Sequence, residues 1–259
     1  MNFLNTVRID LMKMRRSAAV WLSILGAGVI PLIFFLMYIA KPAKFYIESQ
    51  QMGWLAHITR SWQSFASFLL PMFVILICSL ILQIEYKNNT WKQVFASPVS
   101  VSQVFFSKLV TIVLMTLLLM LMFNIFDILA AIVPNLFYPK YGFLNHAIDW
   151  GALLKLNTKT FISLLGIISL QYWLSLRFRN FIVPIGIGLG LLIICMVALN
   201  WEHSDKLPYA FPLLTLMHSF EGKPSGSSFF FNHELNSIAY FLVFTLLAFL
   251  DLRFRKERG

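Results

Sequence analysis

Residues 85–108 read EYKNNTWKQVFASPVSVSQVFFSK and separate two long apolar blocks, Phe65–Ile84 before them and Leu109–Val133 after them. Each block has about the 20 apolar residues that cross roughly 30 Å of hydrocarbon as a helix. The stretch between them therefore connects two membrane spans. Ser100 or Ser102 is placed to cap the helix that begins the second span, because serine side chains accept hydrogen bonds from exposed helix N–H groups.

The composition is that of an integral membrane protein. Of the 259 residues, 59% are hydrophobic and only 12% are charged, and the mean hydropathy is +0.75. Soluble domains carry about 25% charged residues, so this class is excluded. A formal net charge of +10 would suggest nucleic-acid binding in a soluble protein. In this chain the orientation of the spans explains the charge better, and no nucleic-acid partner is expected.

Six apolar blocks predict six spans in one all-α transmembrane domain over residues 1–259. The fourth and sixth blocks are short or have polar edges. No small-residue cleavage site follows the first block, which favours a retained span over a signal peptide. The predicted spans are Ala19–Ala40, Phe65–Ile84, Leu109–Val133, Phe161–Leu176, Phe181–Asn200 and, approximately, His233–Leu252.

Six spans place both termini on one side of the membrane, and the distribution of Lys and Arg indicates which side. The termini and the second and fourth connections carry 13 Lys and Arg residues, whereas the longer connections on the opposite side carry 8. Short loops rich in Lys and Arg remain cytoplasmic. We therefore expect both termini and residues 85–108 to be cytoplasmic.

Small residues inside the apolar blocks indicate packing rather than chemistry. Cys78 and Cys195 fall at different depths in their spans, too far apart for a disulfide. The run PIGIGLG at 184–190 has no strand–helix context and so does not predict a dinucleotide site. Its glycines are typical of close helix packing in membranes.

Two further segments do not fit simple spans or loops. Phe3–Arg16 has helical apolar periodicity between charges, which predicts a helix along the inner membrane surface; an ordinary basic flank of the first span is the alternative. Leu207–Phe220 is apolar but broken by Pro208 and Pro212. It predicts a re-entrant or interfacial segment, because irregular backbone at membrane depth must be covered by protein.

No constellation for catalysis is present in the sequence. The five histidines lack metal-ligand spacing, and neither H-E-x-x-H, nor G-x-S-x-G, nor a Walker phosphate loop occurs. We therefore expect no enzyme activity, no catalytic residue, no metal site and no cofactor bound by this chain.

Asn124 and Asp127 are the polar pair of the third span. They are three residues apart and share a helix face. An ionisable residue in a span is a candidate for function, which makes the pair a candidate substrate pathway or interhelical contact. The alternative is a hydrated structural role, because Asp127 lies only about 9 Å from Val133 at the outer boundary.

The connection between the second and third spans carries the strongest functional signal. Residues 88–95 can form a short helix that ends before Pro98, with Trp91, Val94 and Phe95 as large apolar side chains. Apolar side chains in a solvent-facing loop indicate cover by another protein. The alternative is that Trp91 rests at the lipid interface.

The run EYKNNTWKQVFASPVS, followed by Lys108, resembles permease subunits of ABC-2 type ATP-binding cassette transporters. The likeness is closest to the subgroup called lantibiotic-protection or multidrug permeases. The resemblance implies an N-terminal elbow helix, a second permease chain and a separate ATPase that holds ATP and Mg. It also implies that residues 85–98 dock into that ATPase. The candidate docking residues are Glu85, Thr90, Trp91, Lys92, Val94, Phe95 and Pro98.

The expected function is export or extraction of an amphipathic peptide or hydrophobic compound across a bacterial inner membrane, as in multidrug or bacteriocin resistance. One alternative is a secondary transporter, which would need mid-membrane charges and internal repeats. The other is a membrane immunity or assembly factor that does not transport.

Overall fold

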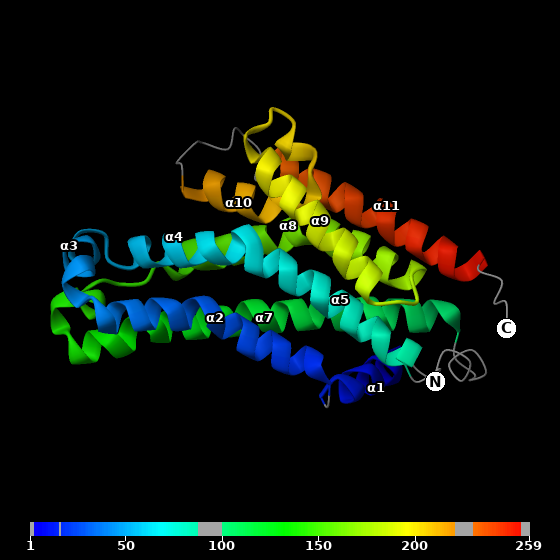
Figure 1. Cartoon of the computed structure of the whole chain (residues 1–259), viewed down its shortest axis with the longest axis horizontal. Helices are drawn as coiled ribbons and strands as arrows, with labels where there is room; N and C mark the ends of the chain where they lie inside the picture. Colours follow the sequence, from blue (N-terminus) through cyan, green and yellow to red (C-terminus); the bar gives the residue numbers. More distant parts are fainter. Residues whose placement is uncertain (1–2, 16, 88–99, 221–229, 255–259) are drawn as a thin grey trace.

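The computed structural model describes residues 3–15, 17–87, 100–220 and 230–254, and helices form almost all of this part of the chain (Figure 1). Six helical stretches are long and apolar enough to cross a membrane, which confirms the predicted all-helical, six-span fold. They are Ala18–Ala40, Trp54–Ile84, Val101–Phe137, Trp150–Arg177, Ile182–Asn200 and Asn232–Phe254.

The structure describes ten α-helices, one π-helix and five short helical turns. In chain order they are α1 (Phe3–Arg15), α2 (Ala18–Ala40), α3 (Pro42–Met52), α4 (Trp54–Ser64), the π-helix η1 (Phe65–Leu69), α5 (Leu70–Lys87), α7 (Val101–Phe137), η2 (Pro139–Tyr141), η3 (Phe143–Asn145), α8 (Trp150–Arg177), α9 (Ile182–Val197), η4 (Ala198–Asn200), η5 (Ser204–Lys206), η6 (Pro208–Ala210), α10 (Phe211–Phe220) and α11 (Asn232–Phe254). The elements η2 to η6 are short 3₁₀ turns.

Several helices are much longer than their apolar blocks. The 37 residues of α7 span about 55 Å at 1.5 Å per residue, well beyond the roughly 30 Å of hydrocarbon. The second span begins at Trp54 rather than Phe65, because α4 continues through η1 into α5. Similarly, α8 begins at Trp150, eleven residues before its apolar block. Because these extensions contain polar residues, hydropathy did not predict that they continue the helices.

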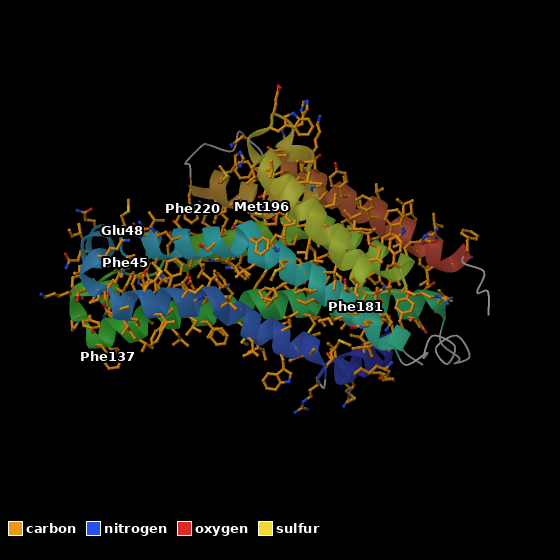
Figure 2. The ribbon with its side chains drawn as sticks, in the orientation of Figure 1. Phe45, Glu48, Phe137, Phe181, Met196 and Phe220 are labelled. Carbon is orange, nitrogen blue, oxygen red and sulfur yellow. The ribbon has the colours of Figure 1, made fainter. Side chains whose placement is uncertain are left out.

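Two helix pairs form the framework. α2 packs along α7, α11 packs along α8, and α5 lies between the pairs in contact with α2, α7, α8 and α9 (Figure 1). α1, the end of α5, the start of α7 and the end of α11 gather at one end of the molecule, called the loop end below. α3, the start of α4, residues 138–150 and the start of α8 gather at the opposite end, called the pocket end. Figure 2 labels Phe181 toward the loop end and Phe137 toward the pocket end.

Local predictions about small residues are confirmed in part. Cys78 and Cys195 are both buried and free. A Cβ added at Gly188 would lie 2.6 Å from Gln171 Oε1, so this glycine provides the predicted close packing. Gly186 and Gly190 have no such neighbour within 4 Å.

The flanking segments are helical as predicted. α1 covers Phe3–Arg15, and Ser100 caps α7 by accepting a hydrogen bond from the Gln103 N–H at 3.2 Å. Residues 207–220 form η6 and α10, and α10 packs against α8 and α11. The placement of α1 and α10 relative to a membrane stays a prediction.

Candidate functional site

The predicted docking residues lie largely outside the described part of the chain. Thr90, Trp91, Lys92, Val94, Phe95 and Pro98 belong to residues 88–99, which the structure does not describe. Glu85 lies in the last turn of α5. The helix ends that flank this stretch are described, and both are joined to other helices.

On the α7 side, the flank is held by a buried ion pair. Lys108 Nζ lies 3.4 Å from Asp10 Oδ1 on α1, and Ser107 Oγ donates to Asp10 Oδ2 at 2.5 Å. Lys108 and Asp10 are only 3% and 6% exposed. The Tyr172 hydroxyl of α8 donates to the Phe105 carbonyl at 2.9 Å. The first two turns of α7 are therefore joined to both α1 and α8.

On the α5 side, the flank is joined to the end of α8. The Tyr86 hydroxyl donates to the Leu176 carbonyl at 2.8 Å, and Ser79 Oγ lies 3.3 Å from Ser175 Oγ. Both helices that flank residues 88–99 therefore contact α8, which in turn packs along α11.

Asn124 joins two helices. Its Nδ2 donates to Asn157 Oδ1 at 2.8 Å, and Asn157 Nδ2 donates back to Asn124 Oδ1 at 3.2 Å. Each amide also donates to its own helix, to the carbonyls of Met120 and Leu153. This reciprocal pair links α7 to α8, which is the interhelical contact predicted as one option for Asn124.

Asp127 is buried rather than hydrated. It is 3% exposed, Ser61 Oγ donates to its Oδ2 at 2.8 Å, and His57 Nε2 lies 3.2 Å from its Oδ1. The interpretation that Asp127 reaches interfacial water was therefore wrong. The reason is α4, which extends beyond the predicted second span and covers this face of α7.

The His57 ring connects three helices through a defined set of partners. Nε2 faces two acceptors, the carboxylate and the main-chain carbonyl of Asp127, the latter at 2.9 Å. Nε2 therefore carries a proton. In the neutral ring Nδ1 then accepts from the Tyr38 hydroxyl of α2 at 2.9 Å. The Tyr141 hydroxyl donates to the Tyr38 carbonyl at 2.6 Å, so the network extends to η2.

A second buried ion pair was missed by sequence reasoning. Lys159 Nζ on α8 lies 3.5 Å from Glu234 Oε2 on α11, and their side chains are 3% and 0% exposed. Glu234 Oε2 also accepts from the Phe231 N–H at 3.1 Å, whereas Oε1 is buried without a hydrogen-bond partner among the described residues. Lys159 Nζ also lies 4.1 Å from the centre of the Phe231 ring. The only sequence signal was one charged residue near the start of each of the two apolar blocks.

A cavity of about 600 Å³ lies at the pocket end, between α4, the start of α8 and the end of α10. This volume is within the range of small-molecule sites. Figure 2 labels Phe220, which lies on the α10 side of the cavity. The principal lining residues are Trp54, Ile58, Leu156, Lys159, His218 and Phe220.

These features define a multi-pass, all-helical membrane protein with buried polar contacts between its helices. The family model described as ABC-2 family transporter protein matches residues 6–196, about three quarters of the chain. The chain therefore belongs to this family and is a membrane permease component of an ABC transporter. A search of curated proteins finds no match.

Proposed function

We propose that this permease uses ATP hydrolysed by a separate subunit to export or extract an amphipathic peptide or hydrophobic compound. The observation that carries the proposal is the anchoring of both helices that flank residues 88–99. Tyr86 joins α5 to α8, and the Asp10–Lys108 pair joins α7 to α1. A connection whose two ends are fixed in this way can transmit a movement of a soluble ATPase to the membrane helices.

The motor in this proposal is a cytosolic ATPase that holds ATP and Mg and receives residues 85–98 of this chain. The apolar side chains of Trp91, Val94 and Phe95 would fill a pocket on its surface. The loop end is then cytoplasmic, in agreement with the excess of Lys and Arg at both termini and in residues 85–108. The membrane is a bacterial inner membrane, α1 lies along its inner surface, and η6 with α10 re-enters it from outside.

Two permease chains complete the transporter in this proposal, since six helices are few to enclose an amphipathic cargo. α9 supports this arrangement. Gly186 and Gly190 lie one turn apart with open space beside them, and small residues at this spacing allow close approach of another helix. The second chain would be identical or a paralogue.

The proposal is tested by removing the apolar anchors of the docking stretch. In Trp91→Ala/Phe95→Asp, binding of the ATPase that co-purifies with the wild-type chain should weaken by at least about thirtyfold, because a buried aromatic anchor contributes about 2 kcal/mol or more. Transport should be lost while membrane insertion and yield stay normal. Arg179→Ala, an exposed change in the α8–α9 connection, is the matched control and should bind normally.

The same preparation separates the alternatives. If the double variant binds the ATPase as well as wild type, residues 88–99 do not dock and the proposal is wrong. Cargo transport that persists with a hydrolysis-deficient ATPase would instead identify a secondary transporter. An immunity or assembly factor would protect cells without moving cargo.

A further inference from the structure

The cavity at the pocket end has one wall made of apolar side chains. Trp54 and Leu55 of α4, Leu156 of α8 and Phe220 of α10 line this cavity. The Trp54 indole N–H donates to the carbonyls of Phe143 and His146 at 3.0 and 3.1 Å. Trp54 is 6% exposed and its ring packs against His57 and Phe143, so only a small part of it borders the cavity, whereas Leu55 is 54% exposed.

Two charged groups among the residues that line the cavity, Asp149 and Lys155, lie outside the Lys159–Glu234 ion pair. Asp149 Oδ1 caps α8 by accepting from the Ala152 N–H at 2.9 Å, so the helix N-terminus stabilises this carboxylate. Lys159 is paired with Glu234. Lys155 is exposed, and no carboxylate among the described residues forms an ion pair with it. Lys155 is thus the cation left to meet a ligand.

The histidines on the cavity wall add hydrogen-bonding capacity of the same kind. His218 Nδ1 lies 2.7 Å from the Leu214 carbonyl and so donates to it. Its Nε2 is left to accept a hydrogen bond from a protonated acid or, when the ring is protonated, to donate one to an anion. His146, on the connection before α8, also lines the cavity.

We propose that this cavity binds an amphiphile with a single anionic group, such as a fatty acid or an acidic lipid. The anionic group pairs with Lys155 in the cavity that His218 also lines, and the acyl or aromatic part packs on Leu55, Leu156 and the exposed part of Trp54. An apolar lining with a few placed polar groups is the usual form of a small-molecule site. The inference goes beyond the proposed transport, since binding requires neither ATP nor the ATPase.

Binding is measured on the purified full chain in phosphatidylcholine nanodiscs, with 11-(dansylamino)undecanoic acid as the probe and empty nanodiscs as the blank. A saturable component is expected for the acid. The corresponding primary amide has the same tail without the charge and should bind about tenfold more weakly, because hydrogen bonds to charged groups are stronger than neutral ones.

Two pairs of variants locate the site. Ala152→Trp fills the cavity and should abolish saturable binding, whereas Leu154→Trp, at a 70% exposed position on the same helix outside the cavity lining, should bind as wild type. Lys155→Glu should weaken binding about fivefold, as expected for an exposed charge. Lys44→Glu, another exposed lysine at this end, should not. Lys155→Glu changes a solvent-facing residue, so it tests the site even if Ala152→Trp does not fold.

The source of the ligand is settled by adding phosphatidylglycerol to the nanodiscs. If this lipid displaces the probe, the occupant is an anionic membrane lipid, and if it does not, the occupant enters from solution. Both results support the site. Equal binding of acid and amide, or unchanged binding in both Ala152→Trp and Lys155→Glu, would overturn it, and neither result would bear on docking of the ATPase.

Discussion

Each end of the bundle contains one buried lysine–carboxylate pair, and the two pairs differ in how completely they are satisfied. At the loop end, Asp10 Oδ2 accepts a hydrogen bond from Ser107, and Asp10 Oδ1 accepts one from Lys108. At the pocket end, Glu234 Oε2 forms an ion pair with Lys159 and accepts a hydrogen bond from a main-chain N–H. Its Oε1 lacks a hydrogen-bond partner among the described residues. A buried oxygen without a partner costs free energy. The ion pair at the pocket end therefore has fewer of its hydrogen-bonding groups satisfied than the pair at the loop end.

Other buried polar atoms do not repeat this contrast. Among the described residues, buried atoms without a hydrogen-bond partner occur in both halves of the bundle. Trp62 Nε1 and Thr160 Oγ1 lie nearer the pocket end, and Thr6 Oγ1, Trp173 Nε1 and Thr245 Oγ1 lie nearer the loop end. A ligand, a water molecule or a rearrangement of the helices can supply a hydrogen-bond partner to such a group. The difference between the ends therefore lies in the two ion pairs themselves.

Removing the lysine from each pair should lower the free energy of unfolding by different amounts at the two ends. Lys159→Met leaves the carboxylate of Glu234 buried between α8 and α11 and should lower the free energy of unfolding by about 3 kcal/mol. Lys108→Met should cost about 1 kcal/mol, because Asp10 keeps its bond to Ser107 and α1, as a terminal helix, can shift toward water. Unfolding of both variants is followed in detergent by thermal and denaturant titration.

A double variant controls for the loss of packing. Lys159→Met/Glu234→Leu removes both charges and should recover most of the stability, since replacing a buried pair by apolar side chains is commonly neutral or stabilising. Equal losses in Lys159→Met and Lys108→Met would remove the proposed difference between the ends.

The second test concerns the network around His57 at the pocket end. Asp127→Ala removes the acceptor of Ser61 and one partner of His57, and should destabilise the protein by about 2 kcal/mol. Asp127→Asn keeps an oxygen for Ser61 and should cost about 1 kcal/mol. The same unfolding titration compares them, and a wild-type stability in Asp127→Ala would show that the network is not a structural element.

The sequence predicted the spans more completely than it predicted their polar contacts. Apolar runs are local, so all six spans were found, and Ser100, one of the two serines predicted as the cap, caps α7. α4 was missed because His57, Arg60 and Ser61 interrupt the apolar run. Two of these side chains face the protein, where Asp127 satisfies them.

Partners that lie far apart in sequence could not be predicted for the same reason. Lys159 belonged to the count of outer loop charges, yet it is buried against Glu234, 75 residues further along the chain. The pairing depends on the register between α8 and α11, which no local pattern specifies. The face shared by Asn124 and Asp127 was predictable from their spacing, but their partners Asn157 and His57 were not.

The smallest expected effect belongs to the Asn124–Asn157 pair, and it decides between the two roles predicted for Asn124. If the pair is an interhelical contact, a double-mutant cycle with Asn124→Ala and Asn157→Ala should give a coupling of about 0.6 kcal/mol, typical of hydrogen bonds between membrane helices. Both single variants should then reduce transport to the same extent, because each breaks the same contact. If Asn124 instead contacts cargo, Asn124→Ala should impair transport more than Asn157→Ala does. Additive stabilities together with unequal transport would assign Asn124 to the substrate pathway and leave α7 and α8 held by their other contacts.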